Sequence, residues 1–247
     1  MNLEHIFTKF QSVLQKHRNQ LYELLFYPEN LGEIKKTIVS NTHTFSYTFS
    51  NIKIVIPPKF RPSHCIPSTL ENIEITLSIE DEIIVKRLTK HRVEDPLGKL
   101  EKFNIILNSD GYSASWHLDR HEKQEGESIA KNVHPIYHLT FGGHYMESQD
   151  RDKPNRFGET LIVRAPRIMH PPMELILGLD FIFNHFIPLN ELDLLSDRAY
   201  LEIISELKSY IWMPYALAFA KNYCSIIDVD GNRLQFDDKF VTSVLNC

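Results

Sequence analysis

The sequence predicts an α+β protein, with an antiparallel β-sheet meander flanked by an N-terminal helix and two C-terminal helices. Apolar residues of segment 3–26 recur at steps of three and four, which is typical of an amphipathic helix. Between 45 and 121 several segments alternate apolar and polar residues, as half-buried strands do. The helical pattern returns over 173–186 and 196–224. Short connections between the strand segments exclude the crossover helices of a parallel sheet.

The N-terminal part, residues 1–39, is expected to be helical. Its amphipathic helix ends at Pro28, because proline has no backbone N–H to continue the hydrogen-bond ladder. We expect a second, short helix over Leu31–Val39.

Region 42–168 is expected to be mainly antiparallel sheet. Four prolines between 57 and 67 make that stretch an irregular connection rather than a strand. The expected strand segments are 45–49, 52–56, 73–79, 83–85, 103–107, 112–121, 134–145 and 160–164.

Region 171–225 is expected to be helical again. Segment 173–186 is apolar on nearly every side and is therefore predicted to be a core helix. Ser196-Asp197 can cap a second helix that runs to about Cys224 and contains Pro214 as a kink. Residues 226–247 are interpreted as a tail with a turn and a short strand, within a single domain that spans 1–247.

Composition excludes several classes of protein. The 247 residues carry 27 Lys and Arg against 32 Asp and Glu, a net charge of -5 that argues against nucleic-acid binding by bulk electrostatics and leaves only a local site. The three cysteines form no C-x-x-C pair, so neither a disulfide framework nor a cysteine zinc site is supported, and a cytoplasmic location is expected. No stretch approaches the roughly 18 apolar residues of a membrane span, so we expect no membrane association.

Histidine is the unusual residue. The chain has 12, and seven of them lie between 117 and 185. Side chains two apart on a strand share a face, so His117, Asp119 and His121 form one polar row. His134 and His138 form another on the next strand. A hairpin that sets His117 opposite His138 and His121 opposite His134 would gather four imidazoles and one carboxylate in a single patch.

Such a patch supports two kinds of chemistry. Imidazole and carboxylate bind divalent metals such as Zn or Mn, and the candidate ligands are His117, Asp119, His121, His134 and His138. Without metal, a carboxylate beside imidazoles permits acid–base catalysis, in which His117 and His138 act as base and acid next to Asp119.

Three further residues indicate a phosphate-containing substrate. Arg164 belongs to a third strand, and Arg167 precedes His170-Pro171 at the start of a helix. Free backbone N–H groups at the start of a helix favour the binding of an anion, and the positive charge of arginine also favours it. These candidate substrate-binding residues make phosphodiester hydrolysis, by a nuclease, the most concrete reaction class.

Less specific interpretations carry about the same weight. A polar strand face can be a solvated surface, or a buried hydrogen-bonded network that fixes the register of the sheet. A different class of function also fits: a non-catalytic structural or adaptor subunit, whose N- and C-terminal helices contact other proteins of a multi-protein complex.

Part of the sequence, roughly residues 112–187, resembles uncharacterised bacterial proteins of mobile and defence gene neighbourhoods. The resemblance implies a bacterial protein in a defence or toxin-like context but supplies no activity and no active-site assignment. A weaker similarity is to TumE-type toxins, which also carry an aspartate followed by a histidine–proline cluster near a strand. The motifs that carry the first resemblance are Trp116-His-Leu-Asp-Arg-His121, His134-Pro-Ile-Tyr-His138, Gly142-Gly143, Pro166-Arg-Ile-Met-His-Pro-Pro172 and Leu175 to Phe186.

Overall fold

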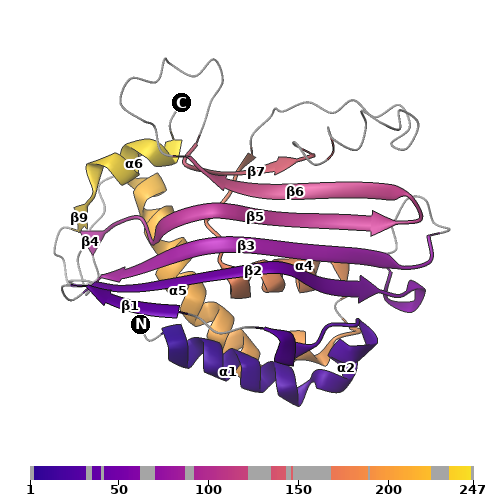
Figure 1. Ribbon diagram of the computed structural model, residues 1–247. Coiled ribbons are helices and arrows are strands. Elements are labelled where there is room, and N and C mark those ends of the chain that lie inside the picture. Colours follow the sequence, from indigo (N-terminus) through magenta and orange to yellow (C-terminus); the bar gives the residue numbers. More distant parts are fainter. Residues whose placement is uncertain are drawn as a thin grey trace.

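A seven-stranded antiparallel sheet forms the centre of the protein, and two helices cover one of its faces (Figure 1). The predicted α+β class, with an antiparallel meander, an N-terminal helix and C-terminal helices, is confirmed. The structure is a computed structural model. It describes residues 3–31, 35–39, 42–61, 70–86, 92–121, 135–142, 146, 168–188, 190–223 and 234–245.

The strands follow one another across the sheet in the order β1-β2-β3-β5-β6-β7-β8, and every neighbouring pair is antiparallel. A separate two-stranded parallel pair joins β4 to β9. The strands are β1 Lys35–Val39, β2 Thr42–Ile56, β3 Ile73–Lys86, β4 Arg92–Val93, β5 Leu97–Ser109, β6 Tyr112–Arg120, β7 Tyr137–Phe141, β8 Ile168–Met169 and β9 Gln235–Phe236.

The long strands combine segments that the sequence suggested separately. Segments 45–49 and 52–56 belong to the single strand β2, which is interrupted by a register shift between Phe49 and Ile52. Asn51 at this shift has a φ of 60°, a left-handed conformation that asparagine tolerates better than most residues. Between β5 and β6, Asp110 and Gly111 both have positive φ, as a two-residue hairpin turn of the primed type requires.

Five α-helices and three short 3-10 helices lie in the described part of the chain. Helices α4 and α5 lie behind the sheet in Figure 1, whereas α1 and α2 lie along its β1–β2 edge. The helices are α1 Leu3–Lys16, α2 Arg18–Glu23, α4 Leu175–Phe186, α5 Arg198–Lys221 and α6 Asp238–Leu245; the 3-10 helices are η1 Pro28–Asn30, η2 Pro58–Phe60 and η3 Asp193–Ser196.

The core lies between the sheet and α4. Ile75, Leu77 and Ile79 alternate along β3 and are fully buried, and α4 approaches them closely at Gly178. A Cβ atom on Gly178 would lie 2.8 Å from the ring of Phe103 on β5, so only glycine allows this spacing. Close packing therefore fixes where α4 crosses β3 and β5.

A buried carboxylate links α4 to α5. Asp180 accepts hydrogen bonds from the Tyr200 hydroxyl at 3.0 Å and from the Asn184 amide at 2.8 Å, and its other oxygen lies 3.4 Å from Lys208 Nζ. Buried carboxylates persist only when they are paired or hydrogen-bonded in this way. The predicted core helix thus carries its one acidic side chain toward its neighbour.

Two sequence-based expectations about the ends of the chain are wrong. The short helix expected over 31–39 is instead strand β1, which pairs with β2; the β-branched run of Thr37, Ile38 and Val39 favours this. The tail contains the expected short strand, β9, but also helix α6, whose start is capped by Asp237 Oδ1 accepting from Phe240 N at 3.0 Å.

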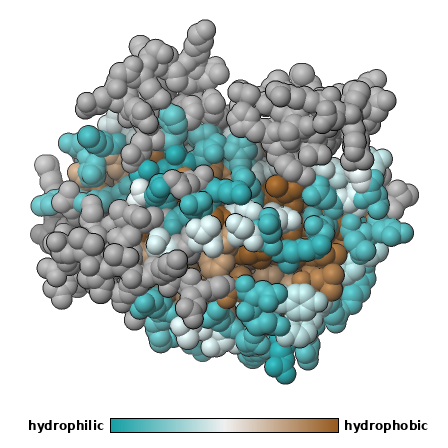
Figure 2. All heavy atoms as spheres, in the orientation of Figure 1, coloured by the Kyte–Doolittle hydropathy of each residue, from teal (hydrophilic) through white to brown (hydrophobic). Residues whose placement is uncertain are grey.

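The face of the sheet that α4 and α5 do not cover points toward the viewer in Figures 1 and 2. In its described part, Figure 2 shows hydrophilic residues around a smaller apolar area. Among the helices that the structure describes, none combines the length and apolarity that crossing a bilayer requires.

Asp197 caps α5 and also ties it to α1, so its replacement should separate two contributions to stability. Its Oδ1 accepts from Ala199 N at 2.8 Å, and its Oδ2 contacts Lys16 and His17. Asp197→Ala removes both sets of contacts and is expected to lower the free energy of unfolding by about 0.5–2 kcal/mol through the lost cap alone. Asp197→Asn keeps the capping oxygen and should cost less; chemical denaturation measures both.

The same carboxylate predicts a pH dependence. Hydrogen bonds from Lys16 and His17 hold the pKa of Asp197 well below its usual range. A lowered folded-state pKa stabilises the protein above the unfolded pKa of about 3.9 and loses that effect as the pH falls. The stability difference between wild type and Asp197→Asn should therefore shrink below about pH 4; a difference that grew on acidification would contradict this assignment.

Candidate functional site

Strands β6 and β7 pair antiparallel, as expected, but in a different register. His117 lies opposite Thr140 and Asp119 lies opposite His138. The predicted pairing of His117 with His138 is therefore wrong by two residues. A shift of two keeps every side chain on its predicted face, because the side-chain period of a strand is two. The histidines of the two strands still share one face.

Core contacts on the other face explain this register. Leu118 lies opposite Leu139, and the rings of Trp116 and Phe141 pack edge to face with centroids 4.9 Å apart. Beyond them Arg120 lies opposite Tyr137.

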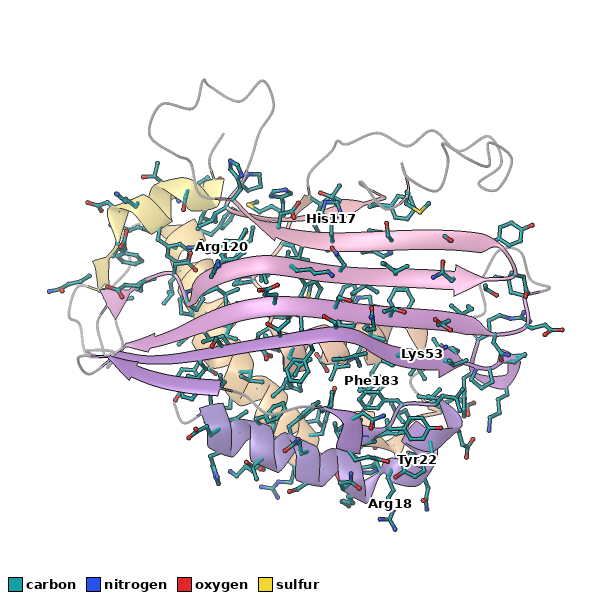
Figure 3. The ribbon with its side chains drawn as sticks, viewed as in Figure 1. Arg18, Tyr22, Lys53, His117, Arg120 and Phe183 are labelled. Carbon is teal, nitrogen blue, oxygen red and sulfur yellow. The ribbon has the colours of Figure 1, made fainter. Side chains whose placement is uncertain are left out.

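The centre of the candidate site is the carboxylate of Asp119, which lies between two imidazoles. Oδ2 of Asp119 is 3.1 Å from Nε2 of His117, its neighbour two residues back on β6. The same oxygen is 3.4 Å from Nε2 of His138 on β7. Figure 3 shows His117 on β6, at the edge of the sheet next to β7. We call these three residues the His–Asp–His cluster.

Exposure differs sharply within the His–Asp–His cluster. The side chain of Asp119 is 50% exposed and that of His117 24%, whereas that of His138 is only 1% exposed. The cluster thus opens at Asp119 and is closed at His138. Partial burial by itself raises the pKa of Asp119, but hydrogen bonds from His117 and His138 and their positive charge outweigh it and hold the pKa well below its usual range.

His138 is held at both ring nitrogens. Its Nδ1 lies 3.1 Å from the carbonyl oxygen of Pro135, and its Nε2 faces Asp119. Both ring nitrogens of His138 therefore face oxygen atoms of the protein. The start of β7 is anchored in turn, because Ile136 N donates to the carbonyl of Ser243 in α6 at 3.0 Å.

A second polar cluster, which the sequence did not reveal, lies on the opposite face of the same strands. Asp95 accepts from Arg120 Nε at 3.1 Å and Nη2 at 2.9 Å, and it also accepts from the hydroxyl of Tyr137. Burial raises the pKa of Asp95, although the charge of Arg120 and the hydrogen bond from Tyr137 act to lower it. Burial and the negative charge of Asp95 raise the pKa of Tyr137 well above its usual value. Nothing local in the sequence marks Asp95 or its partners as a cluster.

Of the other predicted site residues, the structure describes His121 and His170, and His170 lies away from the His–Asp–His cluster. The backbone N–H of His121 donates to the carbonyl of Ile136 at 2.8 Å, in line with the observed register. His170 lies on the helix side of the sheet, where its ring meets Phe181 of α4 edge to face at 6.2 Å. Burial lowers the pKa of His170. His134, Arg164 and Arg167 lie outside the described residues.

Within the described ranges, no group of three or more His, Cys, Asp or Glu side chains is arranged to hold a metal ion. In the described structure the His–Asp–His cluster is a hydrogen-bonded acid–base arrangement, in which the carboxylate of Asp119 orients the rings of His117 and His138.

The lowered pKa of Asp119 predicts how pH affects the cluster. Replacing Asp119 with Asn removes a carboxylate that stabilises the fold above the unfolded pKa of about 3.9 and loses this effect as the pH falls. The stability advantage of wild type over Asp119→Asn should therefore be fully present above about pH 4 and shrink toward pH 2, as urea denaturation at each pH would show. Glu80→Gln, on the same sheet face but outside the cluster, is the control. An advantage that is constant with pH would refute the ion-paired arrangement.

Comparison with protein-family models, with curated proteins and with solved structures found no match to this chain, so the geometry of the cluster is the basis for any functional assignment.

Proposed function

We propose that this chain is a phosphodiester hydrolase, acting on nucleic acid, and that the His–Asp–His cluster carries the reaction. The observation that supports this most directly is the position of the Asp119 carboxylate, within 3.1 Å of one imidazole nitrogen and 3.4 Å of another, on the sheet face that α4 and α5 leave open. A bacterial defence or toxin context remains a prediction from the resemblance of residues 112–187.

His117 is the proposed general base. Asp119 accepts a hydrogen bond from the N–H at Nε2 of this ring. This fixes the tautomer, so that the proton stays on Nε2 and the lone pair is on Nδ1. No described group hydrogen-bonds that nitrogen. Nδ1 can therefore take a proton from the attacking water or hydroxyl, a contribution typically worth about 10²–10⁴ in rate.

His138 is a positioning residue in this proposal rather than the acid. Its side chain is 1% exposed and both of its ring nitrogens face acceptors, so it has no atom left for the substrate. The contact of His138 with Asp119 helps to hold the pKa of Asp119 low, and so keeps Asp119 ionised. Asp119 in turn holds His117.

A metal-assisted version of the reaction, with Zn or Mn, remains the second form of the proposal. Its support is the chemistry of the donors alone, since imidazole nitrogen and carboxylate oxygen are ligands that these ions accept, and the described side chains would have to move to bind an ion. Chelation followed by addition of each ion separates the two forms, because only the metal-assisted reaction should be lost and recovered.

Hydrolysis of RNA, of DNA and of bis(p-nitrophenyl) phosphate by the purified protein tests the proposal. His117→Ala should lower kcat by about 10²–10⁴ because it removes the base. His138→Ala should lower kcat less at neutral pH and distort its pH profile, because it acts only through Asp119. His185→Ala is the matched control: its ring stacks on Phe181 of α4 at 4.1 Å, away from the cluster. Absence of hydrolysis by wild type, or full activity of His117→Ala, would end the proposal.

The second candidate function is a non-catalytic subunit of a multi-protein defence complex. It is favoured by a row of residues on the outer face of α5, formed by Leu201, Ser205, Ser209 and Met213. At the two ends of this row, the side chain of Leu201 is 51% exposed and that of Met213 is 53% exposed. Large apolar side chains exposed together on one helix face are typical of contact surfaces.

Size-exclusion chromatography and co-purification from the native host test this second function. A subunit should elute with other proteins, and Leu201→Glu with Met213→Glu should release it, because charge on an apolar contact is costly. Glu202→Lys beside the row is the control. A monomer that retains no partner would count against it.

A further inference from the structure

We propose that the hydroxyl of Thr140 binds a non-bridging oxygen of the substrate's phosphate group beside His117. This inference rests on the proposed function, since it identifies the group that His117 acts upon, but it is tested by binding rather than by turnover.

Thr140 is placed next to the proposed base by the register of the sheet. It lies directly opposite His117, on the same face, and two residues after His138 on β7. Side chains directly opposite each other in an antiparallel pair have Cβ atoms about 4.5–5.5 Å apart. One phosphate group is small enough to contact both side chains at that spacing.

The hydroxyl of Thr140 has no hydrogen-bond partner among the described residues, although it is buried. The residue is 5% exposed, and its Oγ1 is one of few buried side-chain polar atoms in that part of the chain without a partner. Other buried hydroxyls on this face are satisfied: Ser115 on the neighbouring strand β6 donates to the carbonyl of Gly142, and Ser78 on β3 accepts from Asn51 N at 3.2 Å.

An unsatisfied buried hydroxyl destabilises a folded protein by about 1–3 kcal/mol. Valine would fill the same space on a β-strand without this cost, and β-branched residues suit strands equally well. The hydroxyl of Thr140 lies beside the proposed base and bonds nothing in the described structure. A ligand to which this hydroxyl donates would explain why the position holds threonine. Because a hydroxyl bonds strongly to an anionic oxygen, a phosphate oxygen is the matching acceptor.

Titration of the protein with inorganic phosphate tests this inference, with the imidazole NMR signals of His117 as the readout of binding. Wild type should show saturable shifts. Thr140→Val should bind phosphate at least about tenfold more weakly, whereas Thr140→Ser should stay within about threefold, because serine keeps the hydroxyl. Thr76→Val, on the same face at β3, should bind like wild type.

Denaturation of the same variants provides the second readout. Thr140→Val should be as stable as wild type or more stable, since it removes an unpaired hydroxyl. A clear loss of stability would show that the hydroxyl has a structural partner and would overturn the inference. Unchanged phosphate affinity in Thr140→Val, or no phosphate binding by wild type, would overturn it as well. If the protein binds phosphate through Thr140 but cleaves no phosphodiester, the proposed function is refuted and this inference stands.

Discussion

The register between β6 and β7 is the constraint on which the candidate site depends. One alignment of these two strands places Arg120 and Tyr137 together against Asp95 on the covered face, and Asp119 and His138 together on the open face. Hydrogen bonds to charged groups contribute about 1.5–3 kcal/mol each, and Asp95 accepts three from Arg120 and Tyr137. A slip of two residues would forfeit these bonds. The contacts of Asp95 on the covered face therefore determine how Asp119 and His138 are placed on the open face.

Burial on the open face also separates the interpretations of the histidine pattern. A solvated surface would leave its polar side chains exposed, but Ser78, Ser115, His138 and Thr140 are all buried, at 5% exposure or less. Asp119 is half exposed and His117 partly exposed, and Lys53 and Glu74 are exposed farther across the same face. Around β6 and β7 the face therefore combines buried polar side chains with an opening at the Asp119 carboxylate, which suits a small polar ligand.

The sequence predicted the fold class and the face of each histidine because both follow from periodicity, and periodicity is local. The register could not be predicted, since a shift of two residues preserves the alternation of β6 and β7. Asp95 was missed because its partners Arg120 and Tyr137 lie 25 and 42 residues away along the chain. The sequence does not reveal β1 as a strand, because its five residues are too few for a period to be distinguished. Thr140 attracted no attention, because a threonine in a strand is ordinary until its hydroxyl is found without a partner.

The hydrogen bond from Ile136 to Ser243 has a consequence for the order of events during synthesis. The segment that presents His138 is anchored by a helix made about a hundred residues later, which at a ribosomal rate of 5–20 residues per second is a delay of roughly 5–20 s. Until α6 emerges from the ribosome, the nascent chain lacks this anchor for β7. The arrangement of β7 around His138 is therefore completed only after the chain through α6 has been made.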